Sequence, residues 1–406
     1  MICIDSLHVS LNRFLLLIFG LWPYQQSVLV RLQLTILFSI LTTFIIFQFT
    51  IFVTLKCTPD LLINVLSSAF YTIFFMIKYI SFSINTEIVK YLLDQLQHIR
   101  NELTDEGEIS IIRKYGRYAK RYTIAFLSFA VLVVLASFMF SFWPHIFDVL
   151  FFINRTQSNH LFLFKTEYFI DQERYFYLIT LHANMASIIG IGVVMATGTL
   201  FIFYQQHACG MFQIASYRIK QAMIFKTLRN NNLQNKYLIY KKLIYAVDMH
   251  CKAMRFSELI ISRFKVMFCV LIIFAVLCGS INIFWASISI IQYIFQTMSS
   301  EYEIAELLFH FMIIIIEIVY ILTANYLAQE IIDHNNNIYV TVYNIQWYIT
   351  PLQIQKMVLF LLQRRTKEFN LNIAGLFVGS LEGAATVRNI YILRHGLNII
   401  YFKQIK

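Results

Sequence analysis

The most unusual reactive side chain in the sequence is the carboxyl group of Glu317. It lies inside an otherwise uncharged apolar run that is long enough to cross a membrane, two helical turns after His310. A carboxylate at such a depth is costly and therefore marks a functional site by default. The alternative is that Glu317 faces a watery interior or a polar neighbouring helix, and the sequence leaves both interpretations open.

The other residue types that commonly do chemistry are scattered along the chain. The ten histidines and six cysteines form no H-E-x-x-H or C-x-x-C pattern, and the sequence has no G-x-S-x-G and no glycine-rich phosphate loop. Cys269 and Cys278 lie inside an apolar run, which is typical of buried thiols. The sequence therefore predicts no enzyme, no catalytic residues, no cofactor and no metal centre.

Aromatic and other large side chains recur along several apolar runs, and as a group they can line an apolar pocket for a small volatile or lipid-like ligand. Packing and the interfacial aromatic belt are the commoner roles of any single one. With Glu317, the predicted pocket residues are Phe70, Tyr71, Phe74, Phe75, Phe138, Phe142, Trp143, His182, Met185, Phe309 and Ile313.

Long apolar helices are needed to position these residues. Hydrophobic residues make up 59% of the 406 residues and charged residues 14%, with only 12 glycines and 4 prolines. Soluble domains carry about 25% charged residues. The composition excludes a disordered chain, a collagen-like repeat and a disulfide scaffold, and it predicts an all-α integral membrane protein that forms one domain over residues 1–406.

Uncharged runs of about 20 residues predict where the chain crosses a bilayer. Seven spans are expected, at about 32–55, 61–82, 122–147, 176–205, 266–291, 307–328 and 372–400. The fourth run, uncharged from Arg174 to Arg218, should extend beyond the membrane. We also expect a short surface helix before Pro23 and a helix that does not span at about 340–365. Lys78 closes the second run, where its ammonium group can snorkel to the interface.

The distribution of lysine and arginine predicts the orientation. Most of the 33 basic residues lie in 1–31, 83–121, 206–265 and 328–371, and few lie in the intervening loops. The positive-inside rule then places the N-terminus in the cytoplasm. The sequon Asn154-Arg155-Thr156 falls on the outer side, so Asn154 is a predicted glycosylation site. The net charge of +11 is mainly inner-surface charge, and nucleic-acid binding is not expected.

Several motifs resemble the insect odorant receptor family, particularly its ant and wasp members. Four of them are Gly20-Leu-Trp-Pro23, Glu167-Tyr-Phe-Ile-Asp171, His207 to Arg218 and His250 to Phe256. The strongest block begins at Asp333-His-Asn-Asn-Asn337 and continues through Tyr343-Asn-Ile-Gln-Trp347-Tyr348, Pro351, Lys356 and Gly375 to Glu382. The resemblance covers the chain to about residue 383.

This resemblance implies the ligand-binding subunit of an odorant-gated, non-selective cation channel. The subunit would sit in the plasma membrane of olfactory neuron dendrites, bind small volatile or hydrocarbon odorants, and form a heterotetramer with the shared co-receptor Orco. The cytoplasmic ends of the fourth to sixth helices and the first half of the seventh would form an anchor domain, and the rest of the seventh would line the pore. The implied subunit contacts are Tyr343, Trp347, Tyr348 and Lys356.

The tail departs from the family pattern after Glu382. Arg388 and Arg394 fall where the family has an apolar stretch that ends in Ser/Thr-Tyr-Phe. Two arginines in a pore helix would repel permeating cations. A mis-joined last exon in the gene model explains the abrupt change better than an unusual pore half. The pore candidates, which share one helix face, are Leu393, Leu397 and Tyr401.

Three alternative classes fit the sequence less well. A gustatory receptor of the same superfamily would usually end in a Thr-Tyr…Gln-Phe motif, which is absent. A G-protein-coupled receptor would need the opposite charge bias and an Asn-Pro-x-x-Tyr in its last span. A secondary transporter would show inverted repeats and helices broken by glycine or proline.

Overall fold

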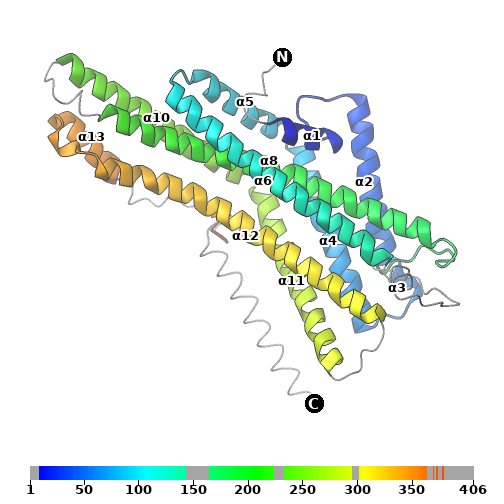
Figure 1. Ribbon diagram of the computed structural model, residues 1–406. Coiled ribbons are helices and arrows are strands. Elements are labelled where there is room, and N and C mark those ends of the chain that lie inside the picture. The colour runs from blue at the N-terminus through cyan, green and yellow to red at the C-terminus, as the bar shows by residue number, and fades with distance from the viewer. Residues whose placement is uncertain are drawn as a thin grey trace.

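The computed structural model describes residues 9–142, 164–223, 233–294, 301–363, 369, 372–373 and 377–378. Nearly all of these residues are helical, which confirms the all-α class (Figure 1). Turns and loops join the helices, and the described strands form one short antiparallel pair, in which β1 (Asn372–Ile373) faces β2 (Phe377–Val378). Trp143, Asn154 and nearly all of the predicted seventh span, including Leu393, Leu397 and Tyr401, lie outside the described residues.

Six helical segments in the described part of the chain are long and apolar enough to cross a membrane. They are α2 (Val28–Phe49) with α3 (Ile51–Thr54), α4 (Pro59–Ile84), α6 (Glu106–Ser141), α8 (Phe176–Ala222), α11 (Lys265–Ile294) and α12 (Glu301–Asn344). The other helices are α1 (Ser10–Ile18), α5 (Thr86–Glu102), α10 (Leu233–Arg263), the 3₁₀ turn η2 (Trp347–Ile349) and α13 (Leu352–Gln363).

Side-chain caps mark where several of these helices begin. The Ser27 hydroxyl accepts a hydrogen bond from the third residue of α2, and Thr58 does the same for α4, whose first residue is Pro59. Asp105 accepts from the backbone N–H of Gly107 at the start of α6. These are the residue types that satisfy the free N–H groups of a first helical turn.

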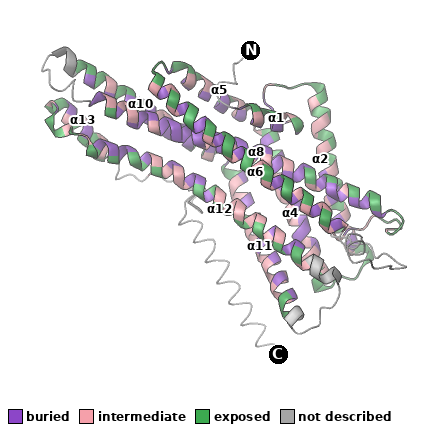
Figure 2. Ribbon diagram, viewed as in Figure 1, coloured by how far each residue is buried: buried purple, intermediate pink, exposed green. Residues whose placement is uncertain are grey.

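Helix α8 is the central element of the bundle. It contacts α1, α2, α4, α6, α10 and α12, and Figure 2 shows buried residues along much of its length. In its most apolar window 67% of the residues are buried, against at most 33% in any other candidate span. As predicted, this helix is a single overlong element of 47 residues.

Two glycines let neighbouring helices approach α8 closely. A Cβ atom at Gly190 would overlap the ring of Phe75 on α4, and a Cβ atom at Gly192 would overlap the ring of Phe19 just after α1. The Gly-Ile-Gly pattern is therefore a helix-packing feature, as its position in a span predicts. Because Gly190 has no side chain, the ring of Phe75 has room to pack directly against α8.

The short helix α1 packs against the bundle. Asn12 donates a hydrogen bond to the carbonyl of Thr199 on α8 at 3.1 Å, and the hydroxyl of Tyr79 on α4 donates to the carbonyl of Phe19 at 3.1 Å. The chain then turns at Gly20, whose φ of 67° lies in the left-handed region that glycine tolerates best. The predicted short helix before Pro23 is present, with bounds Ser10–Ile18.

The non-spanning helix expected at about 340–365 corresponds to α13, whose bounds differ from the expected ones. Helix α12 runs on to Asn344, and α13 begins only at Leu352, with the η2 turn between them. Pro351 has no N–H group and disfavours helical geometry at the preceding residue, which separates the two helices. The side chain of Gln355 donates to the carbonyls of Tyr348 and Thr350 and so satisfies backbone groups of the break.

The bundle has two ends, which we name by their helices. At the α10 end, α10 and α13 lie beside the final turns of α8 and α12, and at the α3 end lie α3 and the start of α8 (Figure 1). Helices α4, α6, α8, α11 and α12 form the part of the bundle that surrounds the cavities described next.

Candidate functional site

An apolar cavity of about 90 Å³ lies among α4, α6, α8, α11 and α12, and we name it the Glu317 cavity. It is large enough for several waters or a compact organic molecule. Six residues of the predicted pocket line it, namely Phe70, Tyr71, Phe74, Phe75, Ile313 and Glu317. The structure thus brings the four predicted aromatic residues of α4 together with the one acidic residue of the predicted span 307–328.

Eight aromatic residues contribute to the wall of the Glu317 cavity. Tyr71 and Phe75 meet edge to face with ring centroids 4.4 Å apart, and Phe74 meets Tyr320 of α12 in the same way at 5.5 Å. Such edge-to-face pairs add to the stability that burial alone provides. The wall is therefore a preformed apolar surface that suits a small aromatic or aliphatic ligand.

Glu317 supplies a polar contact in this wall. Its Oε1 atom is buried, and it has no hydrogen-bond partner in the described part of the chain. A buried polar atom without a partner is destabilising. A ligand that carries a hydroxyl or amine hydrogen would satisfy this atom, so the cavity favours an apolar molecule with one hydrogen-bond donor.

His310 has a different role from Glu317. Its Nδ1 atom lies 2.7 Å from the side-chain oxygen of Asn282, and its Nε2 atom lies 3.1 Å from that of Asn64. Ser67 also donates to Asn282, at 2.8 Å. These contacts tie α4, α11 and α12 together by hydrogen bonds across helices.

The other predicted pocket residues do not line the Glu317 cavity. Phe309 is buried beside it, next to Phe140 and Phe164, and Phe142 packs edge to face against Phe176. Phe138 is half-buried, Met185 is exposed, and neither lines a described cavity. Their predicted contact with ligand stays a prediction.

His182 fastens the segment before α8 to α2. Tyr168 lies 2.6 Å from Nδ1 of His182, and Thr43 of α2 lies 3.1 Å from Nε2. Burial raises the pKa of Tyr168 well above its ordinary value, so its hydroxyl keeps its proton and donates to Nδ1. The Nε2–H group of the neutral ring then donates to Thr43, whose hydroxyl donates to the carbonyl of Ser39.

Backbone contacts complete this attachment. The N–H of Glu167 donates to the carbonyl of Phe47 at 2.8 Å, and the hydroxyl of Thr50 donates to the carbonyl of Glu167 at 2.7 Å. The ring of Tyr168 stacks on that of Phe47 with centroids 4.1 Å apart. Residues 164–172 therefore form a fixed cover over the α3 end of α2.

Replacing His182 by alanine should loosen this cover. The change removes two hydrogen bonds with a net value of about 1 kcal/mol each. Amide hydrogens in residues 164–172 should then exchange at least about tenfold faster in hydrogen-exchange mass spectrometry, which corresponds to about 1.4 kcal/mol. His98→Ala is the control, because the side chain of His98 is 76% exposed and its one ion-pair partner among the described residues is Glu102. Unchanged exchange in 164–172 would show that His182 does not hold the segment.

The pocket residues predicted from the sequence include none of those that line this cavity from α6. Phe126, Phe129, Ala130 and Val133 line it from α6. Their spacing places them on one helix face, and this signal is visible in the sequence. The sequence does not say which neighbours that face meets, because α6 is apolar on all sides along its span.

Known proteins share features of this sequence and this architecture. The sequence model described as 7tm Odorant receptor matches residues 58–391. The chain belongs to the odorant receptor family. Among solved structures, it is similar to the insect olfactory receptor OR5 from Machilis hrabei in complex with eugenol, with a TM-score of 0.72, 15% identity and coverage of 98% of each chain.

A second structure of the same Machilis hrabei OR5 gives a TM-score of 0.69 at 16% identity, and it covers 98% of this chain and 100% of that one. No curated protein matches the sequence. At these identities the similarity concerns the fold, and it extends over almost the full length of the receptor. The match to the sequence model confirms that the resemblance based on short motifs identified the correct family.

Proposed function

We propose that this receptor is the ligand-binding subunit of an odorant-gated cation channel that assembles with Orco. The observation that carries the proposal is the Glu317 cavity, which is enclosed by five helices, walled by aromatic rings and supplied with one unpartnered carboxyl oxygen. Machilis hrabei OR5 has been solved with eugenol, a compact aromatic molecule with one hydroxyl group. A ligand of that class meets the apolar wall and the Glu317 carboxyl of this receptor together.

The proposed orientation has the N-terminus in the cytoplasm, which places the α10 end inside the cell and the Asn154 sequon outside. Basic residues are concentrated in and around α5 and α10, in agreement with the positive-inside rule. The receptor would act in the dendritic membrane of olfactory neurons. Opening would follow from tighter binding of the odorant to the open arrangement than to the closed one.

Apolar side chains are exposed at the end of α12 and along α13, which supports subunit contacts there. Tyr343 is 71% exposed, Tyr348 63% and Phe360 73%. Lys356 is also exposed, and Trp347 is half-buried. Exposed apolar groups of this kind mark interaction surfaces, and this one fits the anchor contacts that the family resemblance implies.

Whole-cell current recording tests the proposal. The receptor is expressed with and without Orco and exposed to a panel of volatiles and cuticular hydrocarbons, and a parallel variant carries a family-like tail after Glu382. We expect odorant-evoked cation current only when Orco is present. Current from the variant but not from the native chain would show that the native sequence after Glu382 prevents conduction. If both chains reach the surface and neither conducts, while a G-protein readout responds, the channel proposal is wrong.

A further inference from the structure

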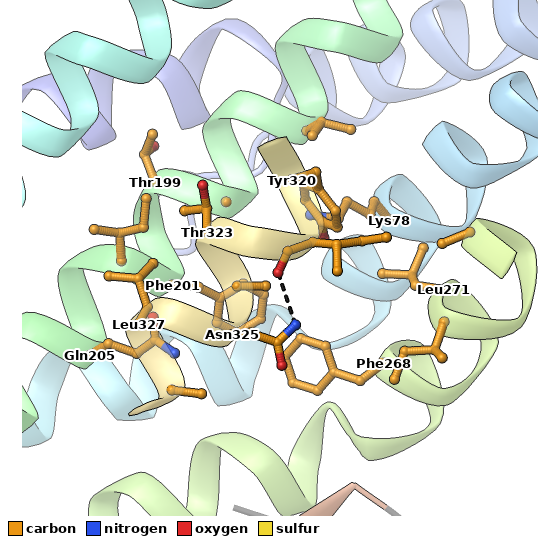
Figure 3. A pocket seen from close by; sticks show the side chains of 18 of the residues that line it. Lys78, Thr199, Phe201, Gln205, Phe268, Leu271, Tyr320, Thr323, Asn325 and Leu327 are labelled. Atoms are coloured by element: carbon orange, nitrogen blue, oxygen red, sulfur yellow. Dashed lines mark hydrogen bonds between the residues drawn. The ribbon is translucent and has the colours of Figure 1, made fainter. Parts of the chain in front are cut away.

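A second and larger cavity, of about 210 Å³, adjoins the first on the side of the α10 end. Figure 3 shows side chains that line it. We name it the Lys78 cavity. Residues of α4, α6, α8, α10, α11 and α12 line it, and most of them are apolar, including Phe201, Phe268, Leu271 and Leu327. Tyr320 is one of five residues that line both cavities.

The side chain of Lys78 is buried within the bundle and lines this cavity. The residue is only 2% exposed, so the prediction that it snorkels to the membrane interface is wrong. Its Nζ atom lies over the ring of Tyr320, 4.8 Å from the centroid, and 5.9 Å from the centroid of Phe74. Cation–π contacts with these rings attract the side chain inward.

Lys78 lacks a counter-ion. Among the described residues, none places a carboxylate within ion-pair distance of Nζ, and the group makes no hydrogen bond there. Burying an ammonium group without an anion or hydrogen-bond acceptors is strongly unfavourable, and the two rings offset only part of that cost. The site is thus electrostatically incomplete, and an anion in the cavity would complete it.

A second polar group in the wall is also incomplete. The side-chain N–H of Asn325 donates to the carbonyl of Ile321 at 2.9 Å, as Figure 3 shows, while its Oδ1 atom is buried and has no hydrogen-bond partner among the described residues. The remaining wall is a broad apolar surface. The Oδ1 atom of Asn325 is an acceptor and needs a hydrogen-bond donor, so the charge of the ligand follows from Lys78 alone. A molecule that pairs with Lys78 along this apolar wall has an extended apolar part and an anionic oxygen group.

We propose that the Lys78 cavity binds an anionic amphiphile, with its carboxylate or phosphate oxygens on the Lys78 ammonium and its acyl chain along the apolar wall. A long-chain fatty acid and an anionic phospholipid share this chemistry. The bilayer around the spans supplies either one. Because Tyr320 lines both cavities, the bound amphiphile would also contact a residue of the Glu317 cavity wall.

Photo-crosslinking of the full-length receptor tests this site. The purified protein in detergent is labelled with a palmitate probe that carries a diazirine near its methyl end, and labelled peptides are mapped by mass spectrometry. We expect labels on the segments of α8, α11 and α12 that contain Phe201, Leu271 and Leu327. Lys78→Met should lower this labelling roughly tenfold, because it removes the charge that pairs with the carboxylate.

Three controls separate a specific site from hydrophobic partition. Lys78→Arg should retain most of the labelling because it keeps the positive charge. Lys120→Met should leave labelling unchanged, since Lys120 is exposed on α6 and does not line the cavity. A matching palmityl alcohol probe should label these segments weakly. Equal labelling by acid and alcohol, or by the native chain and Lys78→Met, would overturn the proposal.

Competition identifies the source of the anion. Excess palmitate that displaces the probe points to a free fatty acid, and vesicles of phosphatidate that displace it better than phosphatidylcholine point to a lipid headgroup. Failure of both competitors would overturn the proposal. If Lys78→Met does not fold, the alcohol probe and the competitors still decide. None of these measurements depends on odorant-evoked current, so they stand apart from the proposed channel activity.

Discussion

Replacing Gly190 by alanine is expected to impair the response to odorants severely. The new methyl group would overlap the ring of Phe75, which is 3% exposed and packed against Ala130 and Ile191. The open space beside that ring is the Glu317 cavity. The ring is therefore expected to move into the volume that the odorant needs.

The size of this effect follows from overpacking. Forcing an extra group into a packed interior costs about 1–3 kcal/mol, and a ligand that must push the ring back meets that cost. The odorant concentration for half-maximal current, measured with Orco, should rise at least about tenfold. Surface labelling of the receptor in the same cells separates weaker binding from lower abundance.

Gly198→Ala is the matched control for this change. It adds the same methyl group to the same helix, but a Cβ atom at Gly198 meets nothing within 4 Å. The double variant Gly190→Ala with Phe75→Leu should recover part of the response, because the smaller side chain leaves room for the methyl group. An unchanged response in Gly190→Ala would show that odorants do not use this cavity.

The sequence predicted the helices of the bundle better than its interior. Long uncharged runs report the free energy of placing a helix in lipid, and that energy depends on composition alone. They therefore located α2, α4, α6, α8, α11 and α12 without knowledge of their neighbours. The overlong α8 was predicted for the same reason, because 43 uncharged residues exceed the thickness of a bilayer.

Lys78 shows why the interior was harder to predict. A lysine near the end of an apolar run can point along the helix to the interface or sideways into the bundle. The same sequence is compatible with both orientations. Here the ring of Tyr320, distant in the chain, provides the inward alternative. The position of His182 likewise depends on the rotation of α8 against α2, which the contacts with Thr43 and Phe47 set.

Breaking the ion pair between Arg218 and Glu108 should destabilise the receptor more than any other single change at the α10 end. Two guanidinium nitrogens of Arg218 donate to the two carboxylate oxygens of Glu108, at 2.6 and 2.8 Å. A third nitrogen donates to the carbonyl of Tyr245 on α10 at 3.0 Å. One side chain at the end of α8 thus holds the first turn of α6 and the middle of α10.

Burial decides the size of the effect. The side chains of Arg218 and Glu108 are only 19% and 10% exposed, so Arg218→Met would leave an unpaired and largely buried carboxylate. Removing one partner of a buried ion pair costs about 3–5 kcal/mol. Arg218→Lys should recover only part of this loss, because lysine lacks the planar fork that binds both carboxylate oxygens.

Thermal unfolding of the purified receptor measures this difference, and Lys252→Met is the comparison. Lys252 pairs with Glu102 and Asp248, but these three side chains are 36%, 39% and 52% exposed, so their loss should cost less than about 1 kcal/mol. Adding Glu108→Gln to Arg218→Met should restore part of the lost stability, because it removes the unpaired charge. Equal shifts for the Arg218 and Lys252 variants would mean that solvent screens both pairs alike, and the α10 end would then be held by its apolar contacts alone.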